Sequence, residues 1–426
     1  MSILLEKILS DENMDLARER VYANKGAAGV DGITVQELSS YMEENWAGIR
    51  EQIRERKYRP QPVLRVEIPK PNGGVRKLGI PTVVDRTIEQ AISQVLTPIY
   101  EPLFSDRSYG FRPNRSCEQA IVQLLEYLND GYTWIVDIDL EKFFDNVPQD
   151  RLMSLIHTVI NDGDTESLIR KYLQAGVMVS GRYEETELGT PQGGNLSPLL
   201  SNIMLNELDR ELEARNLRFT RYADDCIIVV GSKPAATRVM HSVTEWIERK
   251  LGLKVNAEKT HITKPTKLKY LGFGFWHDSN EDRWKARAHE SSVLKFERKL
   301  KQLCKRSWSV SMDCRLRKLN AVIRGWINYF AMADMKKQME RIDKHLRNQM
   351  RIVIWKQWKV PSKREWGLRK LGIEKWQAHA ISYVKGYCKA ARLPQVTKAI
   401  SKEILTRRGL ISPLDYYIQK HALKLN

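Results

Sequence analysis

The amino-acid sequence predicts an α+β fold, in which strands and helices are mixed over the first two-thirds of the chain and helices alone make up the last third. Short apolar runs rich in β-branched residues, such as TWIVDI (133–138) and CIIVV (226–230), are typical of buried strands. From about residue 290, apolar residues recur instead every three or four positions, which is the period of a helix with one buried face. At 426 residues the chain is long enough for two or three domains.

Helix and strand signals follow one another along the first two-thirds of the sequence. Residues 1–60 are expected to be mostly helical, interrupted by the loop NKGAAGVDGIT. Residues 63–81 predict two strands joined by a P-N-G-G turn, and Phe219–Tyr222 with Cys226–Val230 predict a second strand pair. Further helices are expected over residues 82–101, 116–129, 152–160, 196–212 and 235–251, and a further strand over 269–276.

Two apolar stripes characterise the helical last third. Each stripe occupies one face of a helix and therefore predicts a surface buried in the core. The first stripe comprises Leu316, Leu319, Ile323, Trp326, Ile327 and Phe330, and the second comprises Met335, Met339, Ile342, Leu346, Met350 and Val353.

The positive charge of the chain is concentrated in this same region. Residues 285–426 carry 34 Lys and Arg against 10 Asp and Glu, a net charge of +24, whereas the rest carries 36 against 42, a net charge of −6. Six of the eleven tryptophans also lie there. Cations interleaved with aromatic rings suit phosphate contacts combined with base stacking, so the last third predicts a nucleic-acid surface.

Other features exclude several classes of protein. No run of 18 or more apolar residues is present, so neither a membrane span nor a membrane partner is expected. The N-terminus carries acids early and has no cleavage-like site, unlike a secretory signal. The five cysteines are scattered without a C-x-x-C pair, which supports neither a zinc site nor a disulfide framework and fits a reducing cytoplasm.

Two adjacent acids, Asp224 and Asp225, precede the apolar run in RYADDCIIVV. Such a pair between strands marks either a solvated turn or a carboxylate site for a divalent metal. A third carboxylate comes from DIDLEKFFD, where Asp137 and Asp139 share one face of a strand. If Asp139 faces the Asp224–Asp225 turn, the three acids form the kind of ligand set that a pair of Mg²⁺ ions uses in phosphoryl transfer.

The motifs YADD and DLEKFFD resemble the catalytic core of reverse transcriptases. The resemblance continues in order through IPKPNGGVRKLGIP, YGFRPNRSCEQA, GTPQGGNLSPLLSNIML, LGLKVNAEKT and KYLGF, and it covers essentially the whole chain. This set is similar to that of the group II intron-encoded reverse transcriptase–maturases. The resemblance implies a right-hand polymerase fold, with fingers and a palm built on an antiparallel sheet, followed by a helical thumb or maturase domain and a small helical DNA-binding region.

The resemblance also implies domain boundaries. Residues 1–60 would be an N-terminal extension of the fingers, 61–284 the fingers and palm, 285–360 the thumb or maturase (X) domain, and 361–426 the DNA-binding (D) region. The stretch RLRKLNAVIRGWINYF is the most characteristic of the thumb. No Cys- and His-bearing endonuclease segment follows in the sequence, so a compact, bacterial class C-like member that takes its primer from elsewhere is expected.

By the same resemblance, Asp139, Asp224 and Asp225 are the catalytic residues and the ligands of two Mg²⁺ ions, while Asp137 is structural. Phe144 falls where the family places the residue under the incoming sugar, and a bulky ring there excludes a 2′-hydroxyl and selects dNTPs. Phe143, expected on the opposite face of the strand, belongs to the core.

Several polar residues are expected to bind the nucleotide and the template. Lys70, Arg76 and Lys77 flank the P-N-G-G turn, where cations on both arms of a flexible turn suit a triphosphate. Gln192 lies beside two glycines that allow the nucleotide and template to approach the backbone closely. Lys259 is expected to reach the triphosphate or pyrophosphate. The final pair, Arg112 and Arg115, is expected to contact the template backbone.

The resemblance therefore implies an RNA-directed DNA polymerase of the bacterial cytoplasm that also binds its group II intron RNA, promotes splicing and moves the intron by target-primed reverse transcription. Its partners would be intron RNA, an RNA template, a DNA target or primer, and dNTPs. Three alternatives remain open: a maturase without polymerase activity, another prokaryotic reverse transcriptase such as a retron enzyme, and an RNA-dependent RNA polymerase. The intact acids and Phe144 disfavour a maturase without polymerase activity. The N-terminal extension and the helical tail disfavour a retron-like enzyme, and the bulky Phe144 disfavours an RNA-dependent RNA polymerase.

Overall fold

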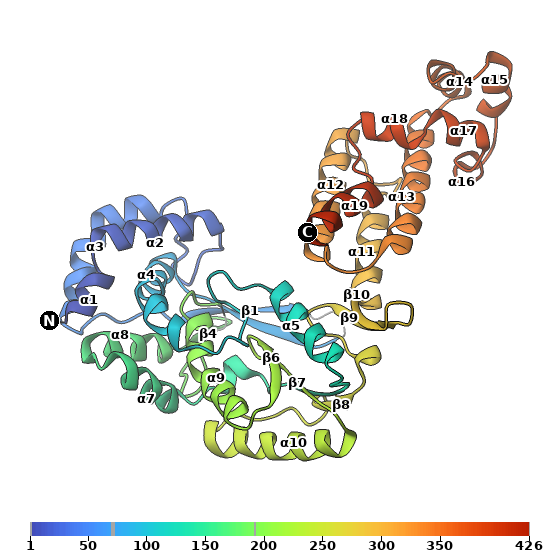
Figure 1. Ribbon diagram of the computed structural model, residues 1–426. Coiled ribbons are helices and arrows are strands. Elements are labelled where there is room, and N and C mark those ends of the chain that lie inside the picture. The colour runs from blue at the N-terminus through green and yellow to red at the C-terminus, as the bar shows by residue number, and fades with distance from the viewer. Residues whose placement is uncertain (1, 70–72, 191–192, 426) are drawn as a thin grey trace. The chain divides into compact units, whose positions relative to one another are not determined.

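The computed structural model describes residues 2–69, 73–190 and 193–425, and it divides the chain into two compact units, Met1–Lys264 and Pro265–Asn426. The first unit mixes helices with two sheets, and the second consists of one hairpin and a set of helices (Figure 1). The α+β prediction is therefore confirmed. Among the described residues no helix combines the length and apolarity needed to cross a bilayer.

A buried central helix, α4 (Val83–Tyr100), organises the start of the first unit. It begins at Thr82, whose side chain accepts a hydrogen bond from the Asp85 backbone N–H. Because α1 and α2 pack on one side of it and α9 on another, even its polar residues Asp85 and Glu89 are buried. The preceding helices are α1 (Ile3–Ile8), α2 (Asp11–Asn24) and α3 (Leu38–Arg54), separated by the predicted loop.

The first sheet has the strand order β2-β1-β4-β5. The predicted hairpin is present as the antiparallel strands β1 (Val63–Pro69) and β2 (Val75–Ile80). Two short strands that the sequence pattern did not reveal, β4 (Val177–Val179) and β5 (Arg182–Glu184), extend this sheet beyond β1.

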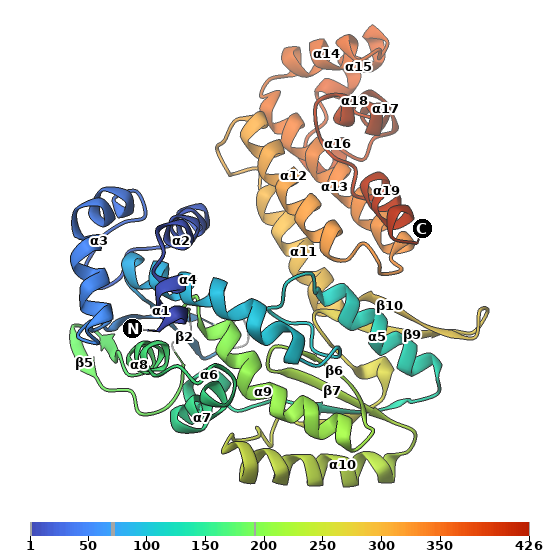
Figure 2. The same cartoon turned by 60° about the vertical axis from the view of Figure 1, so that its left-hand side comes forward.

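The second sheet has the order β6-β7-β3-β8 and positions the candidate site. Its central strands, β3 (Trp134–Ile138) and β7 (Asp225–Val230), are antiparallel neighbours, with β6 (Arg218–Tyr222) and β8 (His261–Thr263) outside them. Helix α10 (Lys233–Trp246) runs beneath the sheet in both views (Figures 1 and 2) and contacts β3, β7 and β8. The remaining helical segments of this unit are α5 (Cys117–Asn129), α6 (Phe143–Asn146), α7 (Gln149–Ile160), α8 (Gly163–Leu173), α9 (Ser197–Ala214), η1 (Glu101–Leu103) and η2 (Ile247–Leu251).

The second unit opens with η3 (Pro265–Lys267) and the hairpin of β9 (Phe273–Asp278) and β10 (Arg283–Ala288). The expected strand starts later than predicted because Gly272, at φ +84°, forms a left-handed turn before it. The boundary between the units falls before this hairpin, whereas the sequence placed a domain boundary after residue 284.

Three helices lie side by side in the second unit, α11 (Glu290–Leu303), α12 (Met312–Tyr329) and α13 (Lys336–Gln357), and α19 (Pro413–Leu425) packs on α12 and α13 (Figure 2). Both predicted stripes are core faces; Trp326 alone is half-buried, stacked on Phe296 at 4.4 Å between ring centroids. The chain between α13 and α19 forms short helices: α14 (Pro361–Lys370), α15 (Lys375–Ser382), α16 (Tyr387–Ala390), α17 (Pro394–Ala399) and α18 (Lys402–Arg407).

Candidate active site

The register of the second sheet brings the three predicted acids to one edge. Ile138, the last residue of β3, pairs with Cys226 of β7, so Asp139 leaves its strand beside the turn that carries Asp224 and Asp225. The charge of Asp139 contributes to raising the pKa of both turn acids, so the three carboxylates lie within electrostatic reach of one another.

Dehydration and mutual repulsion both act on these carboxyl groups. Asp225 is exposed at the start of β7, yet loss of hydration and then the charges of Asp224, Asp137 and Asp139 raise its pKa to about 6. Burial raises the pKa of Asp224 in the same direction. A site that disfavours its own negative charges in this way favours a bound cation.

Asp137 lies inside β3, between Ile227 of β7 and His261 of β8. Burial raises its pKa to about 6, although the nearby His261 lowers it. Asp137 lies neither on the turn nor at the end of the strand, but its charge acts on Asp225 and so adds to the negative potential at this edge.

A segment far along the sequence holds Asp139. The backbone N–H of Asn256 donates to the Asp139 carbonyl at 2.8 Å, and the Asp139 N–H donates to the Thr260 hydroxyl at 3.1 Å. Between these anchors, Lys259 Nζ donates to Oδ1 and Oδ2 of Asp139 at 3.0 and 3.2 Å. Lys259 therefore lies against one of the three acids and offsets its charge, and its predicted contact with the nucleotide phosphates stays a prediction.

The described residues contain no group of three or more His, Cys, Asp or Glu side chains already arranged around a cation position. The chemistry of the donors nevertheless fits a divalent metal, because carboxylate oxygens are the ligands that hard cations prefer. The raised pKa values of Asp224 and Asp225 are a second sign that a bound cation would stabilise these carboxylates. The acids present therefore fit a divalent cation, with Lys259 holding Asp139 in this structure.

The turn between β6 and β7 is held by a buried ion pair that the sequence pattern did not reveal. Ala223 has a left-handed backbone, with φ +56°, a conformation that costs a non-glycine residue roughly 1–2 kcal/mol. Its carbonyl accepts a hydrogen bond from Arg221 Nη1 at 2.8 Å. The fully buried Arg221 is fixed in turn by Asp209 at 2.7 and 2.5 Å and by Asn202 at 3.0 Å, both on α9.

The loop before α5 supports the same turn from another side. A Cβ atom at Gly110 would lie 2.2 Å from the backbone nitrogen of Ala223, so only glycine fits there. Asn202 Nδ2 donates to the Gly110 carbonyl at 2.9 Å, and the Tyr109 N–H donates to the Arg221 carbonyl at 2.9 Å. The acids thus project from a turn whose backbone is braced on both sides.

The two phenylalanines lie in the short helix α6 rather than on a strand, which corrects the expected strand faces because β3 ends at Ile138. Phe143 is buried in the core, and Phe144 is half-buried, with the two rings edge to face at 5.2 Å. The Phe144 carbonyl accepts a hydrogen bond from Thr190 N–H at 2.7 Å. This contact ties Phe144 to the residues just before the PQGG motif.

The two glycines of the PQGG motif pack closely against β2 and α4. A Cβ atom at Gly193 would lie 2.2 Å from the Gly79 carbonyl of β2, and one at Gly194 would lie 2.7 Å from the Glu89 carboxyl group. Glu89 also accepts a hydrogen bond from Asn195 N–H at 2.6 Å, and burial raises its pKa to about 8. Glu89 thus supports the backbone of Gly194 and Asn195, a role that the sequence pattern did not reveal. The two glycines were expected to let nucleotide and template approach the backbone; in the structure they let β2 and α4 approach it.

The remaining predicted nucleotide and template residues differ in their placement. Lys70 and Gln192 lie outside the described residues. Arg76 and Lys77 are exposed on β2, and the charge of Arg76 acts on Asp224.

The predicted template residues lie before α5. Arg112 is buried, with its guanidinium bonded to Glu101 at 2.9 Å and to the Ser105 and Ser108 carbonyls, so it is turned into the protein. Arg115 pairs with Asp106 at 2.6 Å near the surface.

Comparison with known proteins places this arrangement in a family. Residues 68–275 match the model for "Reverse transcriptase (RNA-dependent DNA polymerase)", and residues 293–372 match "Group II intron, maturase-specific domain". The group II intron-encoded protein LtrA of Lactococcus lactis subsp. cremoris is 34% identical over 61% of this chain and 54% of its own. Protein YkfC of Escherichia coli (strain K12) is 33% identical over 61% of this chain and 78% of its own.

Relatives of lower identity also match this chain. A putative COX1/OXI3 intron 2 protein of Saccharomyces cerevisiae is 29% identical over 63% of this chain and 38% of its own. The chain thus spans about half the length of LtrA, the first of these relatives, and reverse transcriptases as a class use divalent metal ions. With both domain models matched in order and more than two-thirds of YkfC covered, this chain belongs to the group II intron-encoded reverse transcriptase–maturases.

Proposed function

We propose that this protein is an RNA-directed DNA polymerase that extends a DNA primer on an RNA template and also binds its own group II intron RNA to promote splicing and mobility. The observation that carries the polymerase proposal is the acidic edge formed by Asp139, Asp224 and Asp225. Family membership supplies the reaction class, nucleotidyl transfer.

Asp139, Asp224 and Asp225 would hold the divalent cations, which we take to be two Mg²⁺. When bound, such ions activate the primer 3′-hydroxyl and neutralise charge on the leaving pyrophosphate. The contribution of the protein is position: the braced Ala223 backbone fixes where Asp224 and Asp225 project, and residues 256–260 fix Asp139. Lys259 Nζ would exchange its contact with Asp139 for one with the nucleotide phosphates.

The incoming dNTP would lie between the acids, the β1–β2 hairpin and Phe144. We assign Arg76, Lys77 and Lys70 to the triphosphate, because Arg76 is already near enough to act on Asp224. The Phe144 ring would lie against the sugar and exclude a 2′-hydroxyl. Gln192 is assigned to the nucleotide and template by its motif.

For the template, we retain Arg115, which pairs with Asp106 near the surface and can exchange this partner for a phosphate. Arg112 is assigned a structural role instead, because its guanidinium is bonded inside its own loop.

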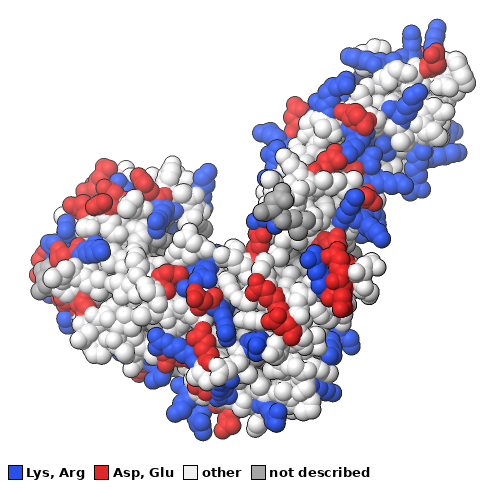
Figure 3. Space-filling view, in the orientation of Figure 1, with Lys and Arg blue, Asp and Glu red and all other residues white. Residues whose placement is uncertain are grey.

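The surface of the second unit supports the intron RNA and DNA proposals. Lys and Arg side chains lie at many places on the face of the second unit seen in Figure 3, and residues 285–426 carry a net charge of +24. Trp366 and Trp376 are 61% and 71% exposed, and Lys370 Nζ lies 4.9 Å from the Trp366 ring. Exposed rings with neighbouring cations suit stacked, unpaired bases.

We therefore retain the expected division into an N-terminal extension (1–60), fingers and palm (61–284), thumb or maturase domain (285–360) and DNA-binding region (361–426). All five cysteines are free thiols, which fits the bacterial cytoplasm as the place of action.

The decisive experiment incubates the purified chain with an RNA template, a DNA primer, dNTPs and Mg²⁺, and separates the products by length. We expect templated extension that EDTA abolishes and that Asp139→Asn does not support. A splicing assay on the intron that encodes the chain runs in parallel. Extension by Asp139→Asn at the wild-type rate would refute the site assignment, and splicing without extension would favour the maturase-only alternative.

A further inference from the structure

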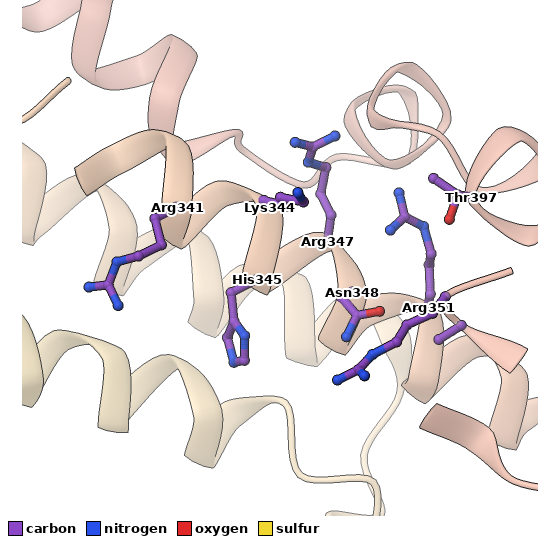
Figure 4. A pocket seen from close by; sticks show the side chains of 9 residues that line it. Arg341, Lys344, His345, Arg347, Asn348, Arg351 and Thr397 are labelled. Carbon is purple, nitrogen blue, oxygen red and sulfur yellow. The ribbon is translucent and has the colours of Figure 1, made fainter. Parts of the chain in front are cut away.

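The second unit contains a cavity of about 540 Å³ between helix α13 and the segment 391–397. Figure 4 shows side chains of α13 along one wall and Thr397 on the other. The cavity is unusual in its charge, because five of its nine lining residues are Arg or Lys and none is Asp or Glu.

Three of the five cations already have partners. Arg341 pairs with Glu297 at 2.6 Å, and Arg347 pairs with the buried Asp343 at 2.9 Å. Arg351 donates from Nε to the Ile400 carbonyl at 3.0 Å. The other two cations, Lys344 and Arg392, are exposed and have no side-chain partner among the described residues. The rim of the cavity therefore carries two uncompensated positive charges.

The base of the cavity is also cationic. Arg351 is 6% exposed, and burial together with the charge of Arg347 one helical turn away lowers the pKa of its guanidinium. Its contact with the Ile400 carbonyl holds the planar group in place, beside the buried Ala391. Two guanidinium groups close enough for their charges to act on each other favour an anionic or electron-rich ligand over an apolar one.

The size of the cavity narrows the choice of ligand. Its volume falls within the range of about 300–1,000 Å³ typical of small-ligand sites. It exceeds what a lone phosphate group needs, and it has guanidinium planes on which a base can stack. Unpaired bases splayed from structured RNA are the usual targets of such sites.

We propose that this cavity receives one unpaired nucleotide extruded from a structured RNA, with its phosphates at Lys344 and Arg392 and its base against Arg347 and Arg351. The inference deepens the proposed function, on which it rests for the RNA partner. It adds a site where shape and stacking, rather than charge alone, select the RNA.

The test compares two RNA hairpins that differ by a single bulged 4-thiouridine, using fluorescence anisotropy at about 150 mM salt, where nonspecific phosphate contacts are weakened. We expect the full chain to bind the bulged hairpin at least fivefold more tightly, and light-induced crosslinks to form within residues 336–357 or 387–400. Lys344→Gln with Arg392→Gln should reduce the preference below twofold. The matched control, Lys295→Gln with Arg298→Gln on exposed positions of α11, should weaken both hairpins equally and keep the preference.

Several outcomes overturn the proposal: no preference for the bulge in the wild-type chain, equal loss of preference in both double variants, or crosslinks confined to other segments. A competition experiment with a free nucleotide provides a further test. AMP should compete with the bulged hairpin only at millimolar concentration; tight AMP binding with no bulge preference would instead make this a free-nucleotide site and refute the proposal.

Primer extension on an unstructured template separates this inference from the proposed function. It should be unchanged in Lys344→Gln with Arg392→Gln. A chain that synthesises cDNA without any bulge preference would refute only the cavity proposal, and a chain that prefers the bulge but synthesises no cDNA would refute only the polymerase.

Discussion

The β6–β7 turn and the α13 cavity both gather like charges, but they hold them differently. The backbone that carries Asp224 and Asp225 is braced by the buried Arg221–Asp209 pair. At the cavity, Lys344 and Arg392 extend from exposed positions, with no side-chain partner in the part of the chain that the structure describes. Catalysis requires its charges in fixed positions, which buried partners provide. RNA recognition needs side chains that can adjust to a ligand, and exposed cations retain that freedom.

The largest effect should come from removing the charges of the turn while leaving the cavity intact. In Asp224→Asn with Asp225→Asn, we expect cDNA synthesis to fall by more than about 1,000-fold, as for other essential catalytic groups. Intron binding and splicing assistance should persist, because the second unit is unchanged. Primer extension and filter binding measure the two activities. A folded variant that loses intron binding as well would show that the two regions do not act separately.

The second prediction breaks the bracing and leaves both acids in place. Arg221→Met should lower the free energy of unfolding by about 3–5 kcal/mol, because Asp209 becomes a buried, unpaired charge. Arg221→Met with Asp209→Leu removes both charges and should recover most of that stability in urea unfolding.

The same double variant separates the effect of Arg221 on the position of the acids from its effect on the stability of the fold. Its cDNA synthesis should stay at least about tenfold below wild type, since the Ala223 carbonyl has lost its donor and the acids are no longer held in place. The expected loss is in kcat more than in KM for dNTP. Recovery of full activity along with stability would mean that Arg221 is merely structural.

A third prediction compares two neighbouring rings. Phe144→Ala should admit ribonucleotides, with dNTP selectivity falling roughly 10–100-fold, since the loss of one contact against a small group changes binding by about 1–3 kcal/mol. Phe143→Ala, at a core position, should instead lower stability by about 3–5 kcal/mol and leave selectivity unchanged. Incorporation of dNTP and rNTP on one template provides the measurement. Selectivity lost only in Phe143→Ala would place the sugar contact one residue earlier.

The effect that is smallest per pH unit concerns the buried Glu89, which lies against Gly194. Because its folded pKa is raised to about 8, the folded protein keeps a proton that the unfolded chain releases near its usual 4.5. Stability should therefore fall as pH rises between these values, by up to about 1.4 kcal/mol per pH unit from this group.

Glu89→Gln keeps an acceptor for the Asn195 N–H and should flatten that slope in urea unfolding between pH 5.5 and 8. The control Glu67→Gln, on an exposed position of β1, should keep the wild-type slope. An unchanged slope in Glu89→Gln would show that this carboxyl group does not hold the proton.

The sequence predicted most of the fold because its elements have strong local signals. The β1–β2 hairpin, β3, β7 and the two apolar stripes of α12 and α13 follow directly from hydrophobic period. The short strands β4 and β5 were missed because three residues carry no period, and they form only by pairing with β1.

The sequence predicted that the three acids would lie close together, but it did not reveal the residues that support them. Asp209 lies on α9 in LSPLLSNIMLNELDREL, where a charged residue looks like part of a solvated face. A signal was present, however, since Asn202, Asn206 and Asp209 form a polar stripe on a helix that is otherwise apolar on several sides. The contact between Lys259 and Asp139, 120 positions apart, could not be read from local pattern at all.

The near-contact of Gly193 with Gly79 has a mechanical consequence. With no room for even a methyl group between the two backbones, the residues after the PQGG glutamine cannot slide over β2 without lifting from it. A displacement of β2 toward Gly193 would have to move Gly193 as well, and the Asn195–Glu89 hydrogen bond anchors the following residues to α4. Residues 193–195 are therefore coupled to β2 at one end and to α4 at the other.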